Sequence, residues 1–211
     1  MFISYNEACA RDCSTLEQDL VLCEKAGFDY IEIRLDMLTD YLKRHTVEEL
    51  AAFFCTSRLK PHAFNALYLY PEFLSEGDDE ARQKELLEEF RLGCEVGRAI
   101  GSHYSIIVPP LQRDPAGGPY TGSWEDTFSN CVRILKELSR RAEPYDMNLC
   151  FELVGFERSS VRSIGQADAV VRAVDRPNVG FVFDSYNIFL NGGCNDFLEA
   201  CSRKRYSPFT L

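Results

Sequence analysis

The chain has 211 residues, of which 45% are hydrophobic and 27% charged, the composition of a globular protein with one sizeable core. Its formal net charge of −10 argues against a nucleic-acid partner, because phosphate backbones are bound by clustered Lys and Arg. No apolar run approaches the roughly 18 residues of a membrane span, so we expect no membrane partner. The nine cysteines are scattered without a Cys-x-x-Cys pair, and no signal sequence is evident, which leads us to expect reduced, mainly buried thiols in a cytoplasmic protein.

Strand and helix patterns alternate along the chain, with capping residues at most helix starts. In order, the predicted elements are a strand at 2–5, a helix opened by Ser14 with Glu17 and ended by Gly27, a strand at 28–36, a helix from Thr46, a strand near 62–69, a helix at 78–101, a strand at 104–108, a helix opened by Ser123 with Asp126, a strand from about 147 to 153, a helix opened by Ser163 with Gln166, a strand from about 178 to 184, and a short helix at 195–201.

This alternation, with short connections, predicts a wholly parallel α/β protein. A doubly wound open sheet and a TIM-type barrel both fit it. The barrel is favoured because no Gly-rich phosphate loop follows the first strand, and polar residues recur at the carboxyl ends of several strands. The chain supplies about six β/α units, against the eight of a complete barrel. We therefore expect an incomplete parallel (β/α) TIM-type barrel.

The most informative stretch runs from Met147 to Asn187 and reads strand, helix, strand. Bulky apolar residues alternate with Glu152 in the first strand and with Asp184 in the second, which places each carboxylate on the face opposite the apolar set. A crossover helix makes the two strands parallel, so both carboxylates should emerge side by side at their carboxyl ends. Two such carboxylates suit a divalent metal or a proton transfer, but each is equally suited to cap the next helix or to pair with Arg158 or Arg162.

Three further residues are candidates for binding a substrate. Glu32 and Arg34 share one face of their strand, where they could contact a polyol or, as we weight higher, form an internal ion pair. Asn65 lies within the third strand, where a buried amide needs a partner from either substrate or protein. The histidines at 45, 62 and 103 lie away from the expected site, and we do not expect them to be ligands.

Four segments carry a likeness to a known family: LEQDLVLCEKAGFDYIEIRLDMLTDYLKRHTVEELAAFF, KPHAFNALYLY, FELVG and NVGFVFDSYN. Together they resemble the xylose-isomerase-like TIM-barrel family of sugar isomerases and epimerases, with the greatest likeness to its inosose isomerases of inositol catabolism. The resemblance implies an eight-stranded barrel with one divalent metal ion (Mn, Mg or Zn), held by a Glu, an Asp, a His and a second Glu after strands five to eight. Glu152 and Asp184 match the first two ligands, and the Glu is also the family's acid/base residue.

The resemblance thus implies a metal-dependent ketose isomerase that acts on a polyol or keto-sugar by proton transfer next to a carbonyl. Glu152 would be catalytic and a metal ligand, Asp184 a metal ligand, and Arg34, Glu32 and Asn65 substrate contacts. A ketose 3-epimerase or an inosose dehydratase of the same fold is the nearest alternative. From a different class, the chain could be an inactive remnant or a subunit that a partner chain completes.

This sequence departs from the family pattern in two places, and each departure leads to a prediction. The family commonly has His three residues after the Asp, where this chain has Asn187. The chain also ends where a seventh strand is expected, so we divide it into a truncated barrel at 1–202 and an atypical tail at 203–211. Two carboxylates alone predict weak metal binding. Unpaired edges at the first and sixth strands predict self-association.

Overall fold

We describe the protein from a computed structural model, which covers residues 2–10, 13–69, 80–112 and 118–192. Its elements are β1 (Ser4–Asn6), the 3-10 helix η1 (Glu7–Cys9), α1 (Leu16–Ala26), β2 (Tyr30–Arg34), α2 (Leu35–Tyr41), α3 (Val47–Thr56), β3 (Lys60–Tyr68), α4 (Glu80–Ile100), β4 (Tyr104–Val108), α5 (Trp124–Ala142), the 3-10 helix η3 (Glu143–Tyr145), β5 (Asn148–Glu152), α6 (Ile164–Val174), β6 (Val179–Val182) and α7 (Ser185–Leu190).

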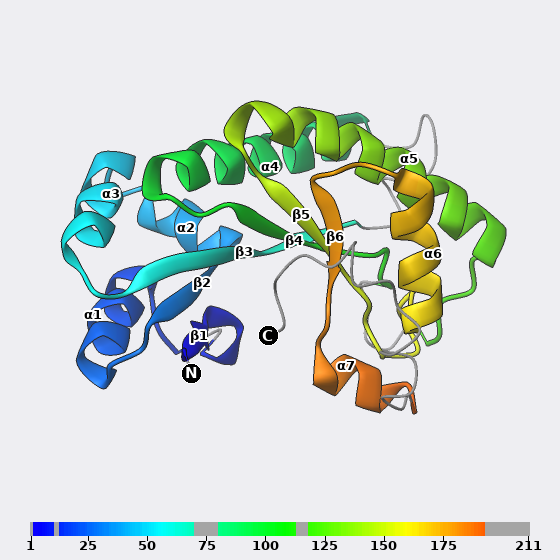
Figure 1. Cartoon of the computed structure of the whole chain (residues 1–211), viewed down its shortest axis with the longest axis horizontal. Coiled ribbons are helices and arrows are strands. Elements are labelled where there is room, and N and C mark those ends of the chain that lie inside the picture. Colours follow the sequence, from blue (N-terminus) through cyan, green and yellow to red (C-terminus); the bar gives the residue numbers. More distant parts are fainter. Residues whose placement is uncertain (1, 11–12, 70–79, 113–117, 193–211) are drawn as a thin grey trace.

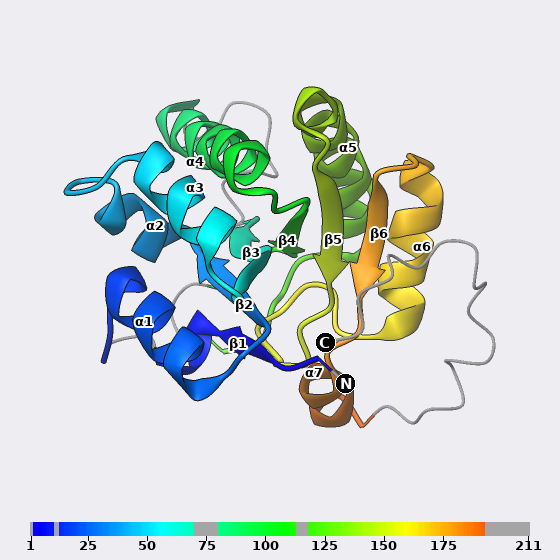
Figure 2. The ribbon, with the colours of Figure 1, turned by 60° about the vertical axis from the view of Figure 1, so that its left-hand side comes forward.

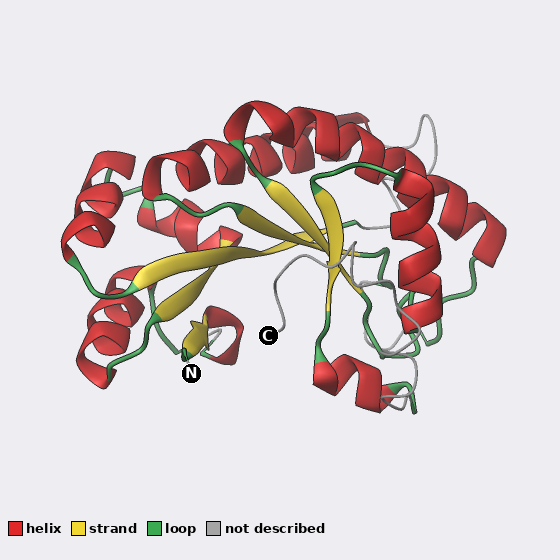
Figure 3. Cartoon of the chain, in the orientation of Figure 1, coloured by secondary structure: helices red, strands yellow, loops and turns green. Residues whose placement is uncertain are grey.

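The strands form one six-stranded sheet in the order β1-β2-β3-β4-β5-β6, and every neighbouring pair is parallel. The sheet is strongly curved, and helices α1, α3, α4, α5 and α6 lie along its outer side (Figure 1 and Figure 2). Helix α7 instead follows the carboxyl end of β6 (Figure 3). The predicted parallel α/β fold is therefore confirmed, with each strand followed by a helix on the way to its neighbour.

The two faces of the sheet are packed differently. The outer face carries the larger apolar cluster, in which Leu149, Phe151 and Phe181 are almost fully buried between the sheet and its helices. A smaller cluster lies on the opposite face and includes Ile106 and Val182. Because side chains alternate along a strand, Glu152 falls on the inner face, as the sequence predicts.

Most helix starts lie where the sequence predicts them. Thr46 opens α3, and its side chain and that of Glu49 form a capping box. Ser163 and Gln166 form the same box at α6. Gly27 ends α1 in the left-handed conformation, with φ 84°. Ser123 likewise caps α5 through the backbone N–H of Asp126.

One capping prediction was wrong, and two helices were missed. Thr15, rather than Ser14, caps α1, while the Ser14 hydroxyl donates to Asp19. Helix α2 begins directly after β2, at residues that we expected to end a strand, and α7 begins just beyond β6, where we expected loop. The predicted helix at 195–201 and the tail at 203–211 lie outside the described residues.

Neither a membrane span nor a disulfide occurs in the described ranges. None of the helices there combines the length and the apolar character that a crossing requires. None of the described cysteines forms a disulfide, and they divide into three exposed and four buried side chains: Cys9, Cys13 and Cys55, and Cys23, Cys94, Cys131 and Cys150.

Candidate active site

The two carboxylates selected from the sequence lie at the ends of neighbouring strands. Glu152 is the last residue of β5, and Asp184 follows β6, with which β5 pairs in parallel register up to Glu152 and Val182. Asp184 also caps α7, because its Oδ1 accepts the backbone N–H of Tyr186 at 2.7 Å and that of Asn187 at 3.4 Å. No ion pair joins either carboxylate to an arginine among the described residues. The prediction that both acids emerge side by side is therefore matched by the geometry, and the helix-capping alternative also holds for Asp184.

A single amide nitrogen links the two acids. The Nδ2 atom of Asn187 donates to Asp184 Oδ2 at 2.8 Å and to Glu152 Oε1 at 3.2 Å. The Oδ1 atom of Asn187 accepts the backbone N–H of Gly155, in the loop after β5, at 3.2 Å. Oxygens of Glu152 and Asp184 thus face one common point.

Burial and nearby acidic side chains raise the pKa of Glu152 and of Glu32. Burial raises the pKa of Glu152 to about 8, the charges of Asp184 and Glu32 act in the same direction, and the hydrogen bond from Asn187 opposes them. Burial also raises the pKa of Glu32, as does Asp184, while the hydrogen bond from Asn65 lowers it. Burial and the neighbouring acids therefore favour the protonated forms of Glu152 and Glu32, and a cation bound beside them would favour the carboxylates.

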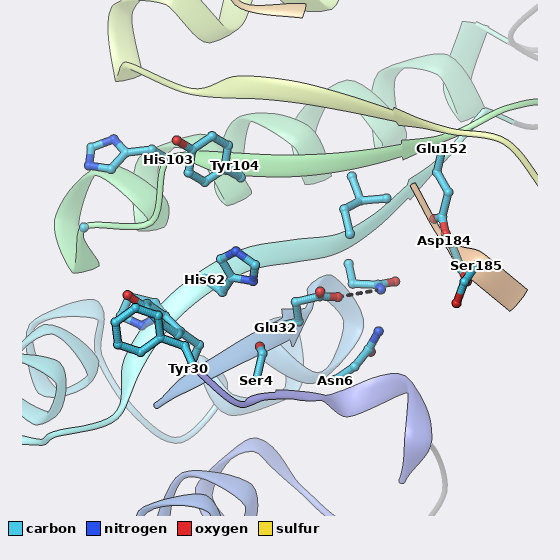
Figure 4. Close-up of a pocket in the computed structure, with 15 residues that line it drawn as sticks. Ser4, Asn6, Tyr30, Glu32, His62, His103, Tyr104, Glu152, Asp184 and Ser185 are labelled. Carbon is cyan, nitrogen blue, oxygen red and sulfur yellow. Dashed lines mark hydrogen bonds between the residues drawn. The ribbon is translucent and has the colours of Figure 1, made fainter. Parts of the chain in front are cut away.

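These acids border a hollow of about 810 Å³ on the inner side of the sheet. Figure 4 shows Glu152, Asp184 and Ser185 on one side of it and Glu32, Ser4 and Asn6 on the other. Its walls come from β1 to β5, the segments beside them and the start of α7: Phe2, Ser4, Asn6, Tyr30, Glu32, Pro61, His62, Asn65, Gly101, His103, Tyr104, Ile106, Glu152, Asp184 and Ser185.

The candidate substrate contacts separate into two groups. Glu32 and Asn65 both line the hollow, and Asn65 Nδ2 donates to Glu32 Oε2 at 3.1 Å. Arg34 is not among the lining residues, and its guanidinium pairs with Asp36 instead. The internal Glu32–Arg34 ion pair that we weighted higher is therefore wrong, because each side chain has a different partner. Arg34 remains a predicted substrate contact without a place in the hollow.

The three histidines lie away from the paired carboxylates. His62 and His103 line the amino-terminal part of the hollow, beside Tyr30 and Tyr104 (Figure 4). His45 stacks on Tyr41 and approaches Glu17 and Glu49 on the outer side. The expectation that the histidines lie away from the site thus holds for His45 only, because His62 and His103 line the hollow at its amino-terminal end.

Two residues of the site were missed as functional candidates. Ser185 directly follows Asp184 and lines the hollow. Asn187 was noted only as a departure from the family pattern, and its bond to Glu152 spans 35 residues. The signal that would have revealed both is position, since polar residues just after a parallel strand collect at the carboxyl end of the sheet.

The donor set fits a divalent cation in part. Carboxylate oxygens are the ligands that Mg²⁺ and Mn²⁺ prefer, and Glu152 and Asp184 direct oxygens toward one amide nitrogen. Within the described ranges, however, no group of three or more His, Cys, Asp or Glu side chains is arranged to hold a metal. The two acids are accordingly a partial ligand set.

Known proteins resemble this chain in both sequence and structure. Residues 20–207 match the model of the family described as xylose isomerase-like TIM barrel. An inosose isomerase of Bacillus velezensis is 37% identical over 206 residues, which cover 97% of this chain and 70% of that protein. An inosose isomerase of Halalkalibacterium halodurans is 37% identical over 200 residues, or 94% of this chain and 67% of that protein.

A solved structure of a similar protein also matches this chain. A crystal structure of the IOLI protein with a bound zinc atom superimposes with a TM-score of 0.84 and 36% identity, covering 98% of this chain and 70% of that one. The match in sequence and the match in structure both extend over nearly the whole chain. The chain therefore belongs to the xylose isomerase-like TIM barrel family.

Proposed function

We propose that the protein is an inosose isomerase, a ketose isomerase of inositol catabolism. The observation that carries the proposal is the convergence of Glu152 and Asp184 on one point at the carboxyl ends of adjacent parallel strands. Relatives at 37% identity that are named inosose isomerase support the choice of reaction. A polyol or keto-sugar is the corresponding substrate class, and the polar hollow beside the acids has room for one.

In this proposal Glu152 moves the proton. Its carboxylate takes the hydrogen of the hydroxyl-bearing carbon next to the carbonyl, and the electrons of that C–H bond form a C=C bond. The carbonyl oxygen gains a proton, which gives an enediol. Loss of the proton from the other enediol oxygen and return of a proton to the former carbonyl carbon complete the isomerisation. No atoms are gained or lost, so no external oxidant is needed.

Glu152 and Asp184 would also hold one divalent metal ion (Mn, Mg or Zn). When bound, the ion would polarise the substrate carbonyl and so acidify the neighbouring C–H bond. The zinc atom named for the IOLI structure supports a metal of this class. Glu32 and Asn65 would contact substrate hydroxyls across the hollow, while Arg34 would contribute only after leaving Asp36.

Deuterium exchange tests this reaction directly. Inosose incubated with the protein and Mn²⁺ in D₂O should exchange the hydrogen next to its carbonyl, which proton NMR follows as a decaying signal. The variant Glu152→Gln keeps the shape of the side chain but cannot take a proton, so its exchange rate should fall at least about 100-fold.

Glu157→Gln is the matched control. It makes the same chemical change at an exposed residue in the loop after β5, and it should exchange inosose at the wild-type rate. Exchange that survives in Glu152→Gln would refute the role of Glu152. Absence of exchange by the wild-type protein with Mn²⁺, Mg²⁺ and Zn²⁺ would refute the proposed function.

A further inference from the structure

Asn187 connects three parts of the site through one side chain. It is 7% exposed, and its amide group makes hydrogen bonds to the end of β5, to the residue that follows β6, and to the loop after β5. The two hydrogens on Nδ2 are directed to two different carboxylates, and Oδ1 accepts from Gly155. No other described residue bonds to both Glu152 and Asp184.

The backbone fixes this side chain in place. Asn187 lies in the first turn of α7, and its N–H is bonded to the capping carboxylate of Asp184. Opposite it, Gly155 allows a close approach, because a Cβ there would lie 2.2 Å from the carbonyl oxygen of Asn187 and 2.8 Å from Leu190 Cβ. The helix therefore packs directly on the loop after β5, and the amide has little freedom to move.

An amide suits this position for an electrostatic reason. Two neighbouring carboxylates repel each other, and each N–H of a neutral amide offsets that repulsion without adding a positive charge that would compete with a cation. The bonds use one oxygen of each acid, Oε1 of Glu152 and Oδ2 of Asp184, and leave further lone pairs on both carboxylates.

We propose that Asn187 is a positioning residue, which holds the carboxylates of Glu152 and Asp184 at the spacing that a divalent cation requires. This inference rests on the proposed metal-dependent function and adds to it a residue that need not touch the metal or the substrate. Residues that orient metal ligands typically change metal affinity by 10- to 100-fold when they are replaced.

The chain offers a matched control at the opposite end of β6. Asn178 makes a comparable network, in which its Nδ2 donates to the carbonyls of Ser139 and Met147 and its Oδ1 accepts from the Ser139 hydroxyl. None of these partners belongs to the site. Asn178→Leu therefore removes a similar set of hydrogen bonds from the same strand region without touching Glu152 or Asp184.

The test is the Mn²⁺ affinity of the wild-type chain, Asn187→Leu and Asn178→Leu, measured from the electron paramagnetic resonance signal of free Mn²⁺. Each protein is titrated well below its own thermal midpoint. We expect Mn²⁺ affinity at least about tenfold weaker in Asn187→Leu, wild-type affinity in Asn178→Leu, and partial recovery in Asn187→His, which keeps one donor. A weak wild-type site only shifts the titration to higher Mn²⁺ concentration.

Three outcomes would overturn the inference: equal affinity in Asn187→Leu and wild type, an equal loss in Asn178→Leu, or no binding by the wild-type chain. Deuterium exchange separates the inference from the proposed function. If the wild-type chain exchanges inosose while Asn187→Leu binds Mn²⁺ normally, the inference fails and the function stands. If affinity falls in Asn187→Leu but no exchange occurs, the function fails and the positioning role stands.

Discussion

Glu7 provides a sharp test of how burial controls stability in this fold. It follows β1 and is fully buried, with its Oε2 accepting the backbone N–H of Arg34 at 2.7 Å. Its Oε1 has no donor among the described residues, and the nearby carboxyl group of Asp19 is also buried. Burial raises the pKa of Glu7 to about 8; the Arg34 backbone bond and charge lower it, and Asp19 raises it.

This raised pKa sets the sign of the pH dependence. The folded protein keeps the Glu7 proton up to about pH 8, whereas the unfolded chain releases it near the ordinary glutamate pKa of 4.5. The free energy of unfolding should therefore fall as pH rises between these values, by up to about 1.4 kcal/mol per pH unit. Glu7→Gln keeps an acceptor for the Arg34 N–H but has no proton to lose.

The variant should thus gain stability over the wild-type chain as pH rises, by roughly 2 kcal/mol near pH 6 and roughly 3 kcal/mol near pH 7, relative to pH 4.5. The other titratable groups near Glu7 do not produce this pH-dependent difference in stability. The pKa values of Tyr5 and Cys23 are raised to about 12 and about 11, above the range tested. Asp19, whose pKa burial raises, is present in both proteins.

Urea unfolding followed by circular dichroism between pH 4.5 and pH 8 measures the difference. Glu48→Gln is the same chemical change on an exposed residue of α3. Its free energy of unfolding should differ from the wild-type value by the same amount at every pH. If the free energy of unfolding of Glu7→Gln also differs from the wild-type value by a constant amount, then burial does not hold a proton on Glu7, and the reasoning is refuted.

Four further predictions follow from described contacts. Ser163→Ala removes the capping box of α6 and should lower the free energy of unfolding by about 1 kcal/mol in urea titrations, and an unchanged midpoint would contradict it. Gly97→Ala places a Cβ 2.5 Å from Met147 Cε and 2.8 Å from the Ser102 carbonyl, so thermal unfolding should show a loss of about 1–3 kcal/mol. Asp184→Asn should keep the cap of α7 yet weaken Mn²⁺ binding, which calorimetry with circular dichroism separates. Each of the terminal strands β1 and β6 has one paired neighbour in the described sheet, so light scattering should detect self-association, and a clean monomer would count against it.

The sequence was most predictive where local pattern and tertiary structure agree. Period-2 alternation around Glu152 correctly separated the buried outer face from the inner face, and the Ser163–Gln166 box correctly placed the start of α6. The strand–helix–strand order, which makes the two strands parallel, placed both acids at the same end of the sheet. These features depend on residues near one another in the chain, which is why reasoning from pattern found them.

Contacts between segments that lie far apart in the sequence were not predicted. Glu32 was assigned to Arg34 because the two share a strand face, yet its partner is Asn65 on β3, where the register against β2 is irregular. The burial of Glu7 beside Asp19 depends on how η1 packs near α1. Helix α7 was missed because it has six residues and its capping residue is Asp184, which reads equally well as a site residue.

The two carboxylate oxygens of Asp184 have different partners, and this limits which residues can replace it. Oδ1 anchors the amides that begin α7, while Oδ2 meets Asn187 at the site. Replacing Asp184 by a residue with no side-chain acceptor would therefore fray the helix as well as remove the charge. A selection experiment for stability alone should still retain an acceptor here, whereas only a selection that includes catalysis should demand the full carboxylate.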